Sequence, residues 1–354
     1  MGIKNLSSTL RKRLAPSVFR SGHISAFAGQ KVAIDSMAFI FKYHTAAGDR
    51  WWRCMVQFIL SFRRHNVHPV FVFDSARRPA EKSDTILARK EASAKRVSKR
   101  DNLEEAFAAY QSDGTVTEPL QKYTIANTGS DAERILLGEG ASDVVDVTLV
   151  AHDLDKLRNQ TRGFSNDVIF LIQAFLDVAG IPYITASYEA DPLCAKLCEE
   201  GVVSAALSPD SDLFAYGCPT IITSYTPKDG TICVVDLNEV LEELDFTRET
   251  FVDFCIMCGT DNNNNIPGVG PMTAFKLLTE HGSIDDIPRD TSSLTHERMR
   301  EIFFGCYEEG NEYRVPWSWC DDIEAVESFL TDNDCAIGIR TLTRALGPRE
   351  VTLG

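Results

Sequence analysis

Two short apolar segments that end in the same acidic residue constrain the fold of this chain most. Lys31-Val-Ala-Ile-Asp35 and His68-Pro-Val-Phe-Val-Phe-Asp74 both have the composition of buried β-strands. Residues 36–64 between them carry apolar side chains at mostly helical spacing, with a break near Ala46-Ala-Gly48. A strand, a helix and a second strand predict a βαβ unit. We therefore expect an α/β fold with a central, mostly parallel, twisted sheet and helices on both faces.

The acids at the ends of these segments indicate where a site would form. A third apolar run, at residues 202–207, is followed by Asp210 and Asp212. In open α/β sheets, sites form at the carboxyl ends of the strands. A solvated surface acid explains any one of these residues, but not the same placement after three strands. We expect Asp35, Asp74, Asp210 and Asp212 to gather at one edge of the sheet.

A predicted helix before the third strand adds two acids one residue apart, Glu189 and Asp191. Four carboxylates around one helix–strand unit would repel one another strongly unless a cation lies between them. Mg²⁺ and Mn²⁺ prefer hard oxygen ligands of this kind. Asp261 is a further acid at the end of an element, because it follows a predicted helix at residues 248–257.

Charge is distributed unevenly along the 354 residues. The whole chain has a net charge of −15, but residues 1–100 carry +14 and the remainder −29. Such asymmetry indicates contact with a polyanion on one face, with a solvated basic surface as the alternative. The basic residues concentrate in a helix-prone run at 77–100, which includes Lys82, Arg89 and Lys90.

The character of the sequence changes three times and predicts four regions. They are a basic first region at 1–100, an acidic insertion with weak helices at 101–160, a return to alternating helices and strands at 161–262, and a helical last region at 263–354. Gly268-Val-Gly270 lies between two predicted helices of the last part, so we expect a helix-hairpin-helix element there. The alternative is an ordinary tight turn. Glycines in such a hairpin let the backbone approach a phosphate closely.

Cysteine spacing and hydropathy exclude several classes of protein. Cys255 and Cys258 form a Cys-x-x-Cys pair without a second pair of ligands, so a buried helix is expected in place of a zinc site. No apolar run is long enough to span a bilayer, and the first residues lack the apolar core of a signal peptide. We expect a protein that acts inside the cell without a membrane partner.

Together these segments resemble the XPG-like flap endonuclease family of structure-specific 5′ nucleases. The resemblance rests on MGIKNL, KVAID and VFVFD near the start, and on GIPY, YEADPLCA, SPDSDLFAYG, FVDFCIMCGTD and IPGVGPMTA further along. It implies a PIN-like nuclease core built from the first and third regions, with the basic run as an arch. It also implies Mg²⁺-dependent hydrolysis of phosphodiester bonds at DNA flaps and single-strand/double-strand junctions, in replication, repair or recombination.

The resemblance assigns roles to residues one by one. Asp35, Asp74, Glu189, Asp191 and Asp210 resemble the ligands of a first metal ion, and Asp210, Asp212 and Asp261 those of a second. Lys82 and either Arg89 or Lys90 resemble the basic catalytic residues of the arch. Four positions are similar to residues that contact DNA in the family: Gly2, Phe41, Gly268 and Gly270. The resemblance also implies a K⁺ ion bound at the hairpin of Gly268 and Gly270.

These assignments imply a two-metal mechanism. Two Mg²⁺ ions about 4 Å apart, replaceable by Mn²⁺, would clamp the phosphate that is cut, and the basic side chains would offset its growing charge. The substrate would be branched DNA, as a 5′ flap or a nicked or gapped duplex, bound by a monomer. Two alternatives within this chemistry are a 5′ exonuclease and a junction-resolving nuclease. A related ribonuclease would lack the hairpin, and a non-catalytic DNA-binding scaffold would have no reason to gather seven acids near phosphate.

The sequence also departs from the family pattern. Asp191 stands where the family usually has Glu, and the acidic insertion lengthens the link between the two halves. The C-terminal residues contain no Gln-led aromatic motif, so sliding-clamp binding is not supported. A compact chain of this kind is compatible with a viral source. We expect it to work in a nucleus, or at a cytoplasmic replication site if it is viral.

Overall fold

The computed structural model describes residues 2–75, 83–124, 145–261, 263, 265–305, 313–317 and 319–347, with only the backbone for 83–86, 88 and 89. The chain divides into two compact units. Unit 1 comprises residues 1–41, 52–85 and 165–354, and unit 2 comprises residues 42–51 and 86–164. The four regions predicted from composition do not correspond to these two units, and that division stays a prediction.

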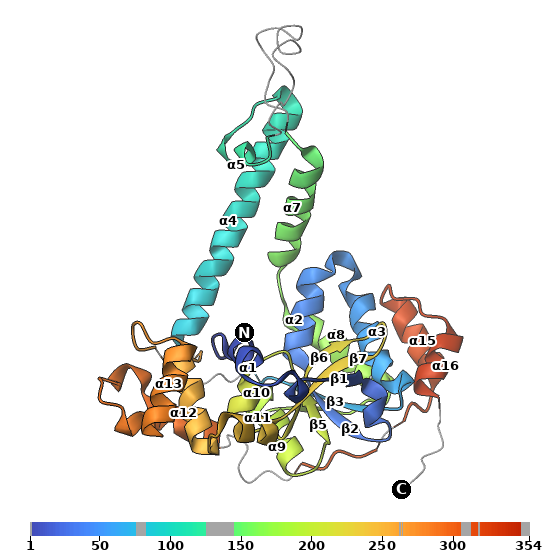
Figure 1. Ribbon diagram of the computed structural model, residues 1–354. Coiled ribbons are helices and arrows are strands. Elements are labelled where there is room, and N and C mark those ends of the chain that lie inside the picture. Colours follow the sequence, from blue (N-terminus) through green and yellow to red (C-terminus); the bar gives the residue numbers. More distant parts are fainter. Residues whose placement is uncertain are drawn as a thin grey trace. The chain divides into compact units, whose positions relative to one another are not determined.

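Unit 1 is built on a seven-stranded sheet in the order β1-β7-β6-β5-β2-β3-β4 (Figure 1). The strands are β1 (Arg20–His23), β2 (Lys31–Asp35), β3 (His68–Phe73), β4 (Tyr183–Thr185), β5 (Ala205–Leu207), β6 (Thr220–Thr226) and β7 (Thr231–Asp236). The five strands from β6 to β4 are parallel, whereas β6–β7 and β7–β1 are antiparallel pairs. The predicted, mostly parallel sheet is confirmed.

The helices of unit 1 surround this sheet (Figure 1). In unit 1 they are α1 (Leu6–Arg13), α3 (Trp51–Arg64), α8 (Asn166–Val178), α9 (Ala190–Glu199), α10 (Asp212–Ala215), α11 (Leu237–Leu244), α12 (Arg248–Cys258), α13 (Pro271–His281), α14 (His296–Phe304), α15 (Ile323–Asp332) and α16 (Ile339–Leu346). Short 3₁₀ turns lie at Pro16–Val18, Ile24–Phe27, Gly48–Arg50, Ile284–Asp286 and Ser292–Leu294. Helix α2 (Ser36–Ala46) runs from unit 1 into unit 2.

Alternation along β3 shows that helices lie on both faces of the sheet. Val70 and Val72 belong to the core cluster that contains Leu193 of α9. Phe71, between them, points to the other face, where its ring centroid lies 6.4 Å from that of Phe58 in α3. All six residues of β3 are buried, as expected for a central parallel strand covered on both sides. None of the helices in the described residues has the length and apolar character needed to span a bilayer.

Unit 2 contains a long helix, α4 (Ser83–Asp113), followed by α5 (Glu118–Gln121) and α7 (Val147–Gln160). Leu103 of α4 is buried in a cluster with Val150 and Leu154 of α7, and Arg158 donates to Glu104 at 2.6 Å. Helix α4 continues through residue 100, where the charge changes from basic to acidic. Charge sign does not end a helix, because Lys, Arg, Glu, Ala and Leu all favour helical backbone.

The start of β2 and β3 is covered by a segment from late in the chain. We call residues 313–317 and 319–320 the tryptophan strap. Lys31 Nζ donates to the carbonyl of Val315 at 2.5 Å, and it lies 4.5 Å from the ring centroid of Trp317. The rings of Trp317 and Trp319 contact the His68 ring edge-on, at centroid distances of 4.4 and 4.8 Å.

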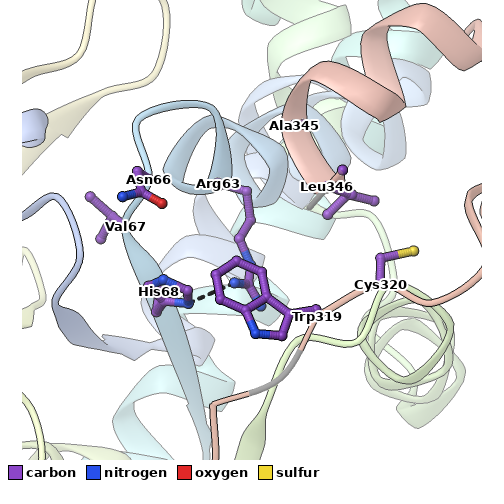
Figure 2. Close-up of a pocket in the computed structure, with 9 residues that line it drawn as sticks. Arg63, Asn66, Val67, His68, Trp319, Cys320, Ala345 and Leu346 are labelled. Carbon is purple, nitrogen blue, oxygen red and sulfur yellow. Dashed lines mark hydrogen bonds between the residues drawn. The ribbon is translucent and has the colours of Figure 1, made fainter. Parts of the chain in front are cut away.

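A buried arginine completes this edge of the sheet. Figure 2 shows Arg63 and His68 joined by a hydrogen bond beside Trp319. Arg63, only 5% exposed, donates to His68 Nδ1 at 2.7 Å and to the carbonyl of Gly180 at 3.1 Å. The small pocket lined by these side chains and Leu346 has room for about one water molecule.

Candidate active site

The first two acids follow neighbouring parallel strands. Asp35 is the last residue of β2, and Asp74 comes directly after β3. Asp35 Oδ2 accepts a hydrogen bond from the Ser208 hydroxyl at 2.8 Å, and Oδ1 accepts a longer one from the Ala38 amide at 3.4 Å. Asp74 Oδ1 accepts from the Ala190 amide at 2.9 Å. Asp74 therefore receives the first free N–H group of α9, where a negative charge is favoured by the helix dipole.

Asp210 and Asp212 follow β5 in a turn that is held by hydrogen bonds within residues 208–212. The Asp210 amide donates to Ser208 Oγ at 3.0 Å, and the Asp212 amide donates to Asp210 Oδ1 at 3.2 Å. Asp212 then begins α10. Because β5 pairs in parallel with β2, this turn and Asp35 lie at the same edge of the sheet.

Three of the predicted acids lie close enough together to share a cation. One carboxylate oxygen from each of Asp191, Asp210 and Asp212 lies within 4.8 Å of the other two. Asp191 reaches this point from the first turn of α9, and Asp212 is only 8% exposed. The parallel pairing of β2 with β3 and β5, together with the start of α9, thus brings the predicted acids to the carboxyl ends of these strands.

The electrostatics of the group are unfavourable without a counter-charge. Burial is the main cause that raises the pKa of Asp35 to about 7; the charges of Asp74 and Asp210 act in the same direction, and the hydrogen bond from Ser208 acts against it. Burial also raises the pKa of Asp191 well above its ordinary value, and Asp35, Asp210 and Asp212 add to the effect. When several carboxyl groups lie together in a partly desolvated site, ionising all of them is energetically unfavourable.

One oxygen atom tests whether a cation fits here. Asp191 Oδ1 is buried and has no hydrogen-bond partner among the described residues. A buried carboxylate oxygen in that state is costly unless it coordinates something. The donor set around it consists of carboxylates, which are the ligands that Mg²⁺ and Mn²⁺ prefer. The residues therefore fit a divalent cation.

The first residues of the chain lie against the same group. Gly2 has a φ of +85°, and a Cβ built on it would collide with the Asp210 carboxylate and approach Asp212 Oδ1 to 2.9 Å. The Ser211 hydroxyl donates to the carbonyl of Ile3 at 3.3 Å, and the Lys4 amide donates to the carbonyl of Gly259 at 2.8 Å. Only a residue without a side chain fits at position 2.

The two remaining acids lie next to these elements but outside the closest group. Glu189 is the N-cap residue of α9, and it is partly exposed. Asp261 follows the Gly259 turn that holds Lys4, so the first residues link its loop to the turn at Asp210 and Asp212. The metal-binding roles of all seven acids stay a prediction.

The predicted hairpin lies between α12 and α13. Gly268 has a φ of +76°, which favours glycine, whereas Gly270 has a φ of −98° and serves as the N-cap of α13. A Cβ at either glycine would meet open space. Val269 between them is buried. Cys255 and Cys258 are buried in α12, so the expected core position of that pair is confirmed.

Family models match the two parts of the chain that carry these acids. The XPG N-terminal domain matches residues 1–96, and the XPG I-region matches residues 180–261. A RAD2-like endonuclease of Invertebrate iridescent virus 3 is 32% identical over 86% of this chain and 85% of its own. Flap endonuclease 1 of Saccharomyces cerevisiae is 30% identical over 94% of this chain and 83% of its own. The chain belongs to the XPG-like flap endonuclease family.

Solved structures agree with this at the level of the fold. The catalytic core of Rad2 in complex with a DNA substrate has a TM-score of 0.63 at 17% identity, covering 94% of this chain and 95% of its own. The flap endonuclease from Methanococcus jannaschii has a TM-score of 0.54 at 18% identity, covering 94% and 96%. The fold and family predictions are confirmed. The chain is a structure-specific 5′ nuclease, a class that acts with divalent metal ions.

The predicted DNA-contacting residues are described only in part. Lys82 lies outside the described residues, as does the side chain of Arg89. Lys90 is exposed on α4, and Phe41 of α2 is 38% exposed. The contacts that these residues and the hairpin would make with DNA stay a prediction.

Sequence reasoning missed the groups that hold the acids in place. These are the hydroxyl of Ser208, the amide of Ala190 and the hydroxyl of Ser75, which donates to the carbonyl of Ser187 at 2.9 Å. A serine two residues before Asp210 is a local signal that was available. The other two partners join distant parts of the chain and are visible only in the fold.

Proposed function

We propose that this family member cuts branched DNA on its 5′ side by means of two divalent ions, Mg²⁺ by preference, held at the carboxyl edge of the sheet. The observation that carries the proposal is the group of Asp191, Asp210 and Asp212, whose buried Asp191 oxygen has no hydrogen-bond partner among the described residues. Asp35, Asp74 and Glu189 would hold the first ion with Asp191 and Asp210. Asp212 and Asp261 would hold the second ion with Asp210.

The chain's own residues have separate tasks in this proposal. When bound, the ions supply an activated water and stabilise the leaving oxygen. The carboxylates would orient the ions, and Asp35, which is only 5% exposed, would shield their inner side from bulk water. Lys82 and Arg89 or Lys90 would contact the phosphate and offset its negative charge. No nucleophilic side chain is required.

Branched DNA is proposed because of what the relatives do. Flap endonuclease 1 is named for a flap substrate, and the Rad2 core was solved with a DNA substrate. Human GEN1, solved with Holliday junction DNA, has a TM-score of 0.59 to this chain and motivates a second candidate, junction resolution. We propose that the chain works as a monomer in a nucleus or at a viral replication site. K⁺ is proposed at the hairpin of Gly268 and Gly270, as the family resemblance implies.

The decisive experiment compares 5′-flap, nicked, gapped and four-way DNA, each with Mg²⁺ and with EDTA. We expect fastest cleavage of the flap, none in EDTA, and a loss of cleavage in Asp210→Asn and Asp74→Asn with DNA binding retained. Asp332→Asn, an exposed acid at the end of α15, is the matched control and should cut normally. Cleavage that persists in EDTA or in either acid variant would contradict the metal roles. Preferred cutting of four-way DNA would support junction resolution, and binding without any cleavage would support a DNA-binding scaffold.

The hairpin has its own test. Gly270→Val should fold with only a small loss of melting temperature, because φ is −98° and a Cβ at this position meets open space, although Val is a less favourable N-cap residue than Gly. It should weaken binding of DNA with a long duplex arm several-fold, because side chains would keep the backbone away from phosphate. Gly268→Ala is the structural comparison, since its φ of +76° makes a side chain cost about 1 kcal/mol. Equal loss of binding for long and short arms by a stable Gly270→Val protein would contradict a duplex contact here.

A further inference from the structure

A single buried hydroxyl connects two of the acids that follow different strands. Ser208 is fully buried, and it lies just after β5. Its Oγ donates to Asp35 Oδ2 at 2.8 Å and accepts from the Asp210 amide at 3.0 Å. Asp35 and Ser208 are 173 residues apart in the chain, so this contact joins the end of β2 to the turn after β5.

The direction of these bonds is determined by the available protons. A serine hydroxyl has one proton, and a backbone amide can only donate. Because the Asp210 N–H already points at Ser208 Oγ, the serine proton is free to go to Asp35. Oδ2 of Asp35 therefore acts as an acceptor, and within the described part of the chain Oδ1 of Asp35 accepts a long hydrogen bond of 3.4 Å from the Ala38 amide.

From this arrangement we infer that Ser208 is a positioning residue for metal binding. It fixes the rotation of the Asp35 carboxylate and, through the Asp210 amide, the start of the turn that carries Asp210 and Asp212. The inference rests on the proposed function, because it takes Asp35 and Asp210 as ligands. Hydrogen bonds to ligating carboxylates orient them, and the loss of such partners weakens metal binding by about 10- to 100-fold in proteins generally.

The test measures metal binding directly, by electron paramagnetic resonance of free Mn²⁺ with the full chain and no DNA. Ser208→Ala should weaken Mn²⁺ binding about tenfold. It should also raise the Mg²⁺ concentration for half-maximal cleavage by a similar factor, while the maximal rate changes less. Ser208→Thr keeps the hydroxyl and should recover most of the affinity.

The matched control is Ser61→Ala. Ser61 is also a buried serine, 1% exposed; its hydroxyl donates to the Phe58 carbonyl and accepts from the Tyr225 hydroxyl, both at 2.6 Å, and neither partner is one of the seven acids. It should lose stability but not Mn²⁺ affinity. If a folded Ser208→Ala protein binds Mn²⁺ within twofold of the unaltered chain, or if Ser61→Ala loses the same affinity, the positioning role is wrong. If the unaltered chain binds no Mn²⁺, the proposed function fails, and the inference fails with it.

Discussion

The two ends of β2 and β3 lie at opposite edges of one sheet and have opposite electrostatics. At their carboxyl ends, Asp35 and Asp74 lie with other acids that raise the pKa of Asp35 and Asp191. At their amino ends, Lys31 donates to the tryptophan strap and Arg63 donates to His68. At the amino ends the cationic groups donate hydrogen bonds to neutral acceptors, whereas at the carboxyl ends several carboxylates lie together.

This difference indicates which edge was shaped by stability and which by chemistry. A chain selected for stability alone would not bury like charges together, since their repulsion is unfavourable in the folded state. Perturbed acids in one place are typical of functional sites.

The largest effect should come from neutralising the central acid. Asp191→Asn should lower cleavage about a thousandfold, because several kcal/mol of transition-state stabilisation depend on the metal. The same change should raise the melting temperature of the metal-free chain by about 2–4 °C, because it removes a buried like charge. Cleavage assays and calorimetry in EDTA measure the two effects. If the melting temperature of Asp191→Asn in EDTA is lower than that of the unaltered chain, Asp191 stabilises the fold, and the contrast between the two ends of the strands is wrong.

The opposite edge should behave in the reverse manner. Arg63→Met should destabilise the fold by about 2 kcal/mol, because His68 Nδ1 and the carbonyl of Gly180 lose a charged donor. Maximal cleavage should change little. Urea unfolding followed by tryptophan fluorescence is a suitable measurement, since Trp317 and Trp319 contact His68. Arg53→Met, at an exposed position of the same helix, is the control. A tenfold fall in maximal cleavage at unchanged stability would contradict the division.

The smallest expected effect is the pH dependence of the metal-free chain. Burial, with the charges of Asp74 and Asp210, raises the pKa of Asp35 to about 7, so the folded state holds this proton more tightly than the unfolded state does. The resulting stability is fully present below about pH 4 and is lost as pH rises through about 7. In EDTA, the melting temperature should fall by a few degrees over this range.

Two comparisons sharpen the pH test. Saturating Mg²⁺ should abolish the fall, because a cation stabilises the ionised carboxylates. Asp35→Asn should make the melting temperature depend less on pH, whereas Arg63→Met should leave this dependence on pH unchanged. A melting temperature that rises between pH 4 and 7 in unaltered protein and stays flat in Asp35→Asn would contradict the raised pKa.

Sequence reasoning located the sheet and its acids because both depend on local patterns. The runs ending at Asp35 and Asp74 are apolar in their interior, which is typical of central parallel strands, and parallel strands bring their carboxyl ends to one side of the sheet. The helix start at Glu189 and Asp191 also agrees with α9, which begins at Ala190. Strand lengths were less accurate: residues 202–207 were expected to be extended, but β5 covers only Ala205–Leu207.

Contacts between distant residues could not be predicted in the same way. Nothing near Trp317 in the sequence indicates that it covers Lys31 and His68, because the strap has no periodicity and makes its contacts by side chains and single carbonyls. The hydroxyl of Ser208 is similar, since its partner Asp35 is fixed only once β5 has paired with β2. A pattern within one element identifies a candidate ligand, but the partner that orients it depends on the assembled sheet.

The order of strands in the sheet has a consequence for synthesis of the chain. β2 is made early and pairs with β3, but its other neighbour, β5, is about 170 residues further along. At about 5–20 residues per second, a ribosome needs roughly 10–35 s to cover that interval. During this time the backbone N–H and C=O groups on one side of β2 have no strand beside them, and such unpaired groups can pair with other chains. Nascent chains that stop before residue 205 should therefore be the ones that chaperones bind longest and that aggregate most readily.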